Sequence, residues 1–156
     1  MIKRVGYLLF ACTFDAFCSS DVNLTLVGYI PSKCEFTALN NNLTMSSKGY
    51  ASTELVIDCN SPMRVSMQSE NGGLSHQHGT QINSYNVTWS IENLGGSETY
   101  SSHLLKTTQY INVGDILFKS MAKLQLELVE PLVYAGDYQD VIRIEMTPSA
   151  ISGGVW

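Results

Sequence analysis

Apolar and polar residues alternate along much of this chain, with the period of two that extended strands show. The most regular example is the segment VNLTLVGYI near the N-terminus. One face of this segment carries Val22, Leu24, Leu26, Gly28 and Ile30. Such a strand can complete the sheet of its own domain or the sheet of another molecule, and the pattern alone leaves both readings open.

The same alternation, bounded by turn signals, predicts further strands. They cover Cys34–Leu39, Thr53–Cys59, Met63–Gln68, Tyr85–Glu92, Tyr110–Phe118, Lys123–Val129 and Tyr138–Met146. The second and third of these flank the turn Asn60-Ser61-Pro62 and are expected to be neighbours. Two polar stretches, Glu70–Thr80 and Leu94–Ser102, are expected to be loops. Helical spacing is not sustained outside the first twenty residues, so the expected fold is an all-β sandwich.

The N-terminus has the pattern of an export signal. A basic head, Lys3 and Arg4, precedes an apolar run too short to span a bilayer. This predicts a leader over residues 1–20, cleaved before Asp21. Acylation at Cys12 is the less favoured alternative, because the bulky Phe10 fits an acylation site poorly.

Once the leader is removed, Cys34 and Cys59 remain as one pair in an oxidising compartment and are expected to form a disulfide. Closing this loop would stabilise the fold by about 3 kcal/mol. A metal site at the pair is not expected, since neither cysteine has a CxxC or histidine partner beside it. The short spacing also disfavours a true immunoglobulin domain.

Charge narrows the range of partners. Fourteen acidic and nine basic residues give the chain a formal charge of −5, and the basic residues are scattered. This argues against nucleic acid and anionic membranes as partners. A low charge content with many small polar residues is typical of a secreted β protein.

Three segments together resemble a fimbrial subunit of the chaperone–usher pathway: VNLTLVGYIPSKC, the cysteine that ends TELVIDC, and the closing strand AGDYQDVIRIEM. In that family the subunit is an incomplete immunoglobulin-like β-sandwich, the pilin fold, which lacks its last strand. An N-terminal extension of the next subunit fills the resulting groove by donor-strand exchange. The resemblance therefore implies a signal peptide over residues 1–20, a donor-strand extension over 21–32 and a pilin β-sandwich domain over 33–156.

The resemblance also implies a role for individual residues. The donor strand would use Val22, Leu24, Leu26, Gly28 and Ile30, the disulfide would join Cys34 and Cys59, and the acceptor groove or chaperone-facing strand would present Ile142, Ile144 and Met146. One departure is the tail Thr147–Trp156, which runs on where family members typically stop. Pro148 makes this tail a poor sheet strand.

The function implied is that of a structural subunit, not an enzyme, exported through the periplasm to a fimbrium on the bacterial surface, where it supports adhesion. Its expected partners are neighbouring pilus subunits, a periplasmic chaperone and an outer-membrane usher, with no nucleic acid and no cofactor or metal.

Two other classes of function stay open. A self-complete secreted β-sandwich could bind carbohydrate or protein through Tyr85, Trp89 and Tyr100, although packing in the core is the simpler role for aromatic residues. A periplasmic metal carrier would use His76 and His78, but such a site needs a further ligand on a rigid scaffold.

Signals of catalysis are weak. Asp137 and Asp140 lie close together in sequence, but their spacing does not place two carboxylates across a substrate, and we expect solvated turn residues. The sequence has no GxSxG, HExxH or phosphate-cradling glycine loop.

Overall fold

The computed structural model describes residues 21–92 and 94–149. Residues 21–30 and the chain from Pro31 onward form two separate units. Regular secondary structure begins at Cys34, so the segment that was expected to be a donor strand is not paired within the described chain. The expected signal peptide, residues 1–20, and the last part of the expected tail, residues 150–156, lie outside the described residues.

The unit from Pro31 onward consists of short and medium strands with one turn of 3-10 helix, η1, and its described residues contain no α-helix. The elements are β1 (Cys34–Ala38), β2 (Tyr50–Cys59), β3 (Met63–Ser69), β4 (Leu74–His76), β5 (Ile82–Asn83), β6 (Tyr85–Ile91), β7 (Ser97–Ser101), η1 (Leu104–Lys106), β8 (Gln109–Val113), β9 (Leu117–Leu128), β10 (Tyr138–Gln139) and β11 (Ile142–Pro148).

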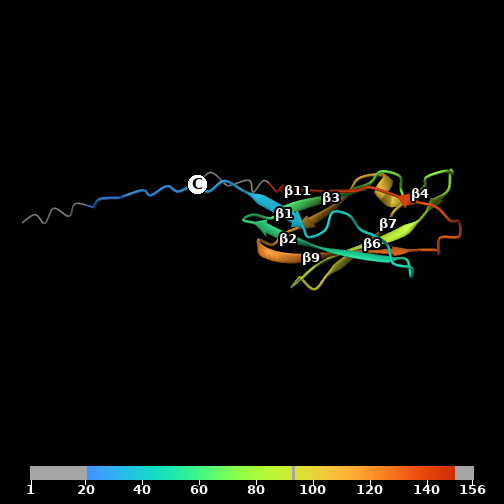
Figure 1. Cartoon of the computed structure of the whole chain (residues 1–156). Helices are drawn as coiled ribbons and strands as arrows, with labels where there is room; N and C mark the ends of the chain where they lie inside the picture. Colours follow the sequence, from blue (N-terminus) through green and yellow to red (C-terminus); the bar gives the residue numbers. More distant parts are fainter. Residues whose placement is uncertain (1–20, 93, 150–156) are drawn as a thin grey trace, which may run out of the picture. The chain divides into compact units, whose positions relative to one another are not determined.

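These strands form antiparallel sheets. A five-stranded sheet has the order β1-β2-β9-β6-β7, a three-stranded sheet has the order β11-β3-β8, and β10-β4-β5 form a small third sheet. Figure 1 shows the first two sheets as two layers, with β11 and β3 in one and β2, β9 and β6 in the other. β1 belongs to the second sheet by its pairing with β2. The protein is therefore all-β, and its layers are consistent with the expected sandwich.

The core lies between the two layers and is built from the alternating rows. On β6, the predicted face is confirmed, because Tyr85, Val87, Trp89 and Ile91 are all buried. β3 contributes Met63, Val65 and Met67, and β2 contributes Leu55, Ile57 and Cys59. Each large apolar side chain that is buried contributes roughly 1.5–3 kcal/mol to the stability of the fold. The period-two pattern therefore favours strands, and the side chains of its buried rows stabilise the packing of the two layers.

The expectation that the strands around Asn60-Ser61-Pro62 are neighbours in one sheet is wrong. β2 pairs with β1 and β9, whereas β3 pairs with β11 and β8 in the other sheet. Both strands bury one row of mostly apolar side chains, and such rows meet when the strands face each other across the core. The turn therefore carries the chain from one layer to the other, and Ser61 is buried within it.

Other parts of the strand prediction also differ: β2 begins at Tyr50 and β9 at Leu117, earlier than expected. The expected strand Tyr110–Phe118 is divided by a turn at Gly114-Asp115 between β8 and β9, which lie in different sheets. The expected loop Leu94–Ser102 contains β7, a polar edge strand that pairs with β6. The expected loop Glu70–Thr80 contains the short strand β4.

The closing strand is also divided. Tyr138–Met146 was expected to be continuous, but β10 ends at Gln139 and β11 begins at Ile142. β11 then includes Thr147 and Pro148, which were expected to lie in a non-strand tail. Proline is accommodated there because β11 is an edge strand.

Candidate functional site

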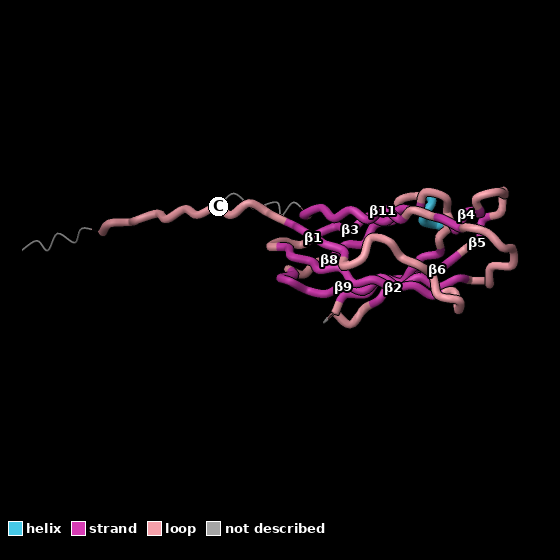
Figure 2. The backbone as a smooth tube through the Cα atoms, in the orientation of Figure 1, coloured by secondary structure: helices cyan, strands magenta, loops and turns pink. Residues whose placement is uncertain are grey.

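The two sides of the sandwich are closed differently. On one side, η1 packs between β3 and β7, and the side chain of Leu105 is fully buried there. On the other side, β1 and β11 lie next to each other. In the described part of the chain, β1 pairs only with β2 and β11 pairs only with β3, so no ladder joins these two edges. Figure 2 shows β1 and β11 near each other in the upper part of the view.

A groove with a volume of about 590 Å³ lies between these edges. Phe36 and Ala38 of β1 line one wall, and Ile142 and Ile144 of β11 line the other. The floor is formed by side chains of β2, β6 and β9, namely Ala51, Thr53, Leu55, Tyr85, Leu124 and Leu126. The named walls and floor are mainly apolar, while asparagine, glutamine and aspartate side chains also line the groove. Over the described residues, the two wall strands pair with no further strand, so their outer backbone groups can accept one.

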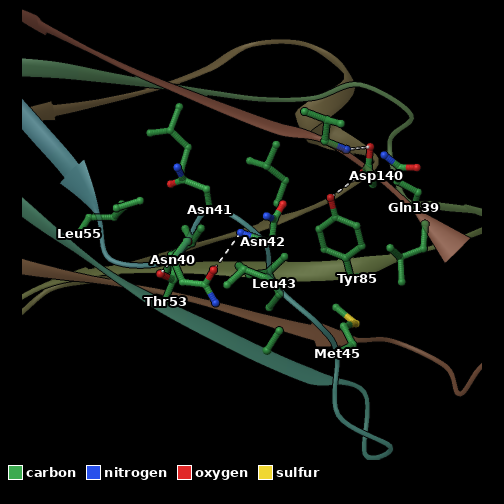
Figure 3. Close-up of a pocket in the computed structure, with 18 of the residues that line it drawn as sticks. Asn40, Asn41, Asn42, Leu43, Met45, Thr53, Leu55, Tyr85, Gln139 and Asp140 are labelled. Atoms are coloured by element: carbon green, nitrogen blue, oxygen red, sulfur yellow. Dashed lines mark hydrogen bonds between the residues drawn. The ribbon is translucent and has the colours of Figure 1, made fainter.

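One end of the groove is polar. The residues that connect β10 to β11 line this end, and the segment Asn40–Leu43, which follows β1, also borders the groove. In Figure 3, Asn40 lies beside Thr53, whereas Gln139 and Asp140 lie beyond Tyr85. Thr53 donates a hydrogen bond of 3.2 Å from its hydroxyl to the carbonyl of Asn40, which attaches this segment to β2.

Asp140 is the centre of a hydrogen-bond network at this polar end. Its Oδ2 accepts hydrogen bonds of 2.6 Å from both the Tyr85 hydroxyl and the Ser69 hydroxyl. Its Oδ1 accepts from the backbone N–H groups of Asn71, at 3.0 Å, and Val141, at 2.8 Å. Figure 3 shows the Tyr85 ring rising from the groove floor toward this carboxylate.

This network corrects the expectation that Asp140 is a solvated turn residue. The side chain of Asp140 is half-buried and accepts four hydrogen bonds, whereas Asp137 is exposed. Burial, reinforced by the hydrogen bond and negative charge of Asp140, raises the pKa of Tyr85 far above its usual value. The phenol therefore stays protonated and acts as a donor that fixes the start of β11.

The disulfide lies toward the opposite end of β11, beside Met146. The expected Cys34–Cys59 bridge is present and joins β1 to β2. Cys59 Sγ lies 3.3 Å from Met63 Sδ and 3.7 Å from Met146 Sδ, so sulfur atoms from both layers meet here.

The three apolar residues predicted for the closing strand lie on one face of β11. Ile142 and Ile144 line the groove, whereas Met146 is not part of its lining and lies beside the disulfide. All three are half-buried and pack against the core. They are thus placed where a further strand on this edge would contact them.

The apolar row of the N-terminal segment is exposed. Val22, Leu24, Leu26 and Ile30 expose between 79% and 96% of their surface. Apart from Gly28 itself and its two chain neighbours, no atom lies within 4 Å of the position that a Cβ on Gly28 would occupy. Large apolar side chains gathered on one short exposed segment commonly mark an interaction site.

The aromatic residues considered for ligand binding lie elsewhere. Tyr85 and Trp89 are buried on the inner face of β6, and Tyr100 on β7 is half-buried. They do not form an exposed aromatic platform, although Tyr85 contributes to the groove floor.

The two neighbouring histidines lie on or beside β4, with ring centroids 6.3 Å apart. His76 Nδ1 accepts a hydrogen bond of 3.2 Å from the backbone N–H of His78, and His76 Nε2 lies 3.2 Å from the carbonyl oxygen of Ala135. Both ring nitrogens of His76 thus have hydrogen-bond partners within the protein. Over residues 21–92 and 94–149, no group of three or more potential metal ligands is present.

Comparisons with known proteins gave no match to a family, to a curated protein or to a solved structure. Within the described residues, no helix has the length and apolar character needed to cross a membrane.

Proposed function

We propose that this chain is a structural subunit of a bacterial surface fimbrium, which polymerises by donor-strand exchange and supports adhesion. The observation that carries this proposal is the apolar groove between β1 and β11, whose two edges have free backbone groups. A neighbouring subunit would insert its segment Val22–Ile30 into the groove as an added strand. This is β-augmentation, in which the backbone ladder gives affinity and alternate side chains give specificity.

The energetics suit this role. Val22, Leu24, Leu26 and Ile30 are almost fully exposed, and each would contribute roughly 1.5–3 kcal/mol on burial. Together they would supply about 6–12 kcal/mol, from which the entropy of ordering the segment must be subtracted. The added strand would also satisfy the free backbone groups of β1 and β11.

The register in which the segment pairs with the groove edges decides which of its side chains are buried. Because side chains alternate between faces, a slip of one residue would place Asn23 and Thr25 in the groove instead of the apolar row. Gly28 interrupts the row with no side chain, so its backbone can approach a shallow part of the groove closely.

The proposed assembly pathway follows from the exposed edges of β1 and β11. An unfilled groove with free strand edges invites incorrect pairing until the correct neighbour arrives. We therefore expect a periplasmic chaperone to cover the groove and an outer-membrane usher to direct the exchange, after export by the leader. The role is mechanical, since inserting a strand requires no catalytic residue and no cofactor.

A self-complete secreted β-sandwich that binds carbohydrate or protein remains the alternative. In that case the groove would be a ligand site or would have no occupant, and Val22–Ile30 would not recognise it. The two functions therefore differ in what fills the groove.

The test uses the unit from Pro31 onward, which has its own core, and a synthetic peptide covering residues 21–30. Binding is measured by fluorescence anisotropy, and thermal unfolding is followed in parallel. We expect saturable binding and a rise in melting temperature with peptide concentration, as for any ligand of the folded state.

The matched control is the same peptide with Leu24 and Leu26 both replaced by aspartate, which should not bind, because two charges would enter an apolar groove. Equal effects of the two peptides, or no effect of either, would contradict the proposal.

A further inference from the structure

The start of the folded unit is held by a clamp centred on Asn60. The backbone N–H of Lys33 donates to Asn60 Oδ1 at 2.7 Å, and Asn60 Nδ2 donates to the carbonyl of Pro31 at 3.0 Å. The backbone N–H of Asn60 also donates to the carbonyl of Lys33 at 3.1 Å. One residue of the β2–β3 turn thus binds both ends of the segment Pro31-Ser32-Lys33.

The clamp holds this segment against the β2–β3 turn. The β1–β2 register pairs Cys34 with Cys59, and the bond between Asn60 and Lys33 continues that ladder by one position. The side chain of Asn60 then extends the contact to Pro31. The disulfide next to it fixes the same two chain segments covalently.

Without the clamp, the extension would match the groove of its own molecule. A hairpin closed by the three residues 31–33 is a common type. Its antiparallel register would place Ile30 opposite Cys34, Gly28 opposite Phe36 and Leu26 opposite Ala38. The β1 residues of these pairs are the half-buried ones, so the apolar row would face inward.

Such a hairpin requires residues 31–33 to reverse direction, and the bonds to Asn60 oppose this reversal. We infer that Asn60 is the residue that decides which groove the extension enters: it prevents insertion into the same molecule and so directs the extension to a second copy of the chain. This inference rests on the proposed function, because it assumes that the groove accepts residues 22–30.

The test compares two chains that begin at Asp21: the unchanged chain and a variant with Asn60→Ala and Pro31→Gly. The first substitution removes both side-chain hydrogen bonds, and the second allows residue 31 to enter a turn. At low protein concentration, we expect the variant to bind the added 21–30 peptide about tenfold more weakly, because its own extension competes for the groove.

Assembly gives a second readout. Analytical ultracentrifugation should show the unchanged chain forming multimers as its concentration rises, whereas the variant should remain monomeric with a melting temperature independent of concentration. A variant with Asn86→Ala and Pro31→Gly is the matched control, because Asn86 is an exposed asparagine on β6. It should behave like the unchanged chain.

Two truncated chains separate failure of the inference from failure of the proposed function. Chains without residues 21–30, with and without Asn60→Ala, should bind the peptide equally, which also shows that the substitution leaves the groove intact. If neither binds, the proposed function fails. If both bind and the full-length variant still binds peptide and forms multimers like the unchanged chain, Asn60 does not direct the extension.

Discussion

The hydroxyl of Tyr85 donates a hydrogen bond of 2.6 Å to the carboxylate of Asp140 at the polar end of the groove. Tyr85 is the first residue of β6, and Asp140 lies two positions before β11. The bond therefore joins strands of the two facing sheets and fixes where the β11 edge begins. Because β11 forms one wall of the groove, this pair controls the shape of the proposed binding site.

Replacing Asp140 by asparagine should destabilise the fold. The carboxylate accepts four hydrogen bonds, and the amide nitrogen of asparagine cannot accept those from Tyr85 and Ser69. We expect a loss of about 1.5–3 kcal/mol in the free energy of unfolding, measured by urea denaturation. Asp137→Asn is the control, since this nearby aspartate is exposed. Similar losses for both variants would show that the network does not stabilise the fold.

Tyr85 should make the stability depend on alkaline pH. Its pKa in the folded state is raised by burial and by Asp140, so above pH of about 10 the unfolded chain releases a proton that the folded chain retains. Its contribution is fully present below this pH and is lost as the pH rises toward the higher folded-state pKa. Each pH unit in this window should remove about 1.4 kcal/mol.

The measurement is the slope of unfolding free energy against pH for the unchanged chain and for Tyr85→Phe. The variant should lose this part of the slope, whereas Tyr110→Phe, at an exposed tyrosine, should change it much less. Identical slopes for all three chains would contradict the role assigned to Tyr85.

The closed side of the sandwich offers a matched pair of leucines in η1. Leu105 is fully buried between β3 and β7, whereas its neighbour Leu104 is mostly exposed. Leu105→Ala should cost about 2–5 kcal/mol of unfolding free energy, as buried leucines generally do, and Leu104→Ala much less. Equal effects would show that η1 does not seal this side.

A side chain at Gly28 should affect assembly but not folding. A Cβ at this position meets no atom within 4 Å in the described structure, so Gly28→Leu should leave the melting temperature of the isolated chain unchanged. In the groove, the extra side chain would hold the backbone away, and binding of the 21–30 peptide should weaken about tenfold or more.

Val27→Leu is the control for this substitution, because residue 27 belongs to the opposite row and would face away from the groove. Equal weakening by both substitutions would contradict the assigned register.

The sequence predicted the parts of the fold that depend on local alternation. The inward row of β6 was identified because Tyr85, Val87, Trp89 and Ile91 follow a strict period of two, and burial of one face requires that pattern. The disulfide followed from the one pair of cysteines that remains after the expected leader, which contains the other two, is set aside. β7 was missed because an edge strand such as SETYS is held by backbone pairing and needs few apolar side chains.

The polar end of the groove could not be predicted. Ser69 and Tyr85 lie 71 and 55 positions from Asp140 in sequence, and only the packing of the two sheets brings them together. The placement of β2 and β3 in different sheets was missed for a related reason. A three-residue turn can close a hairpin or cross between layers, and the choice depends on where the buried faces meet.

The central claim is that residues 22–30 of one molecule occupy the groove of another, and crosslinking between labelled copies tests it most directly. A chain with a photoreactive phenylalanine analogue in place of Leu26 is mixed with an equal amount of ¹⁵N-labelled chain, irradiated and analysed by mass spectrometry. We expect crosslinks between unlabelled and labelled peptides, with the acceptor residues on β1 or β11 beside Ile142 and Ile144. Crosslinks confined to one molecule, crosslinks to surfaces away from the groove, or none at all would contradict the account.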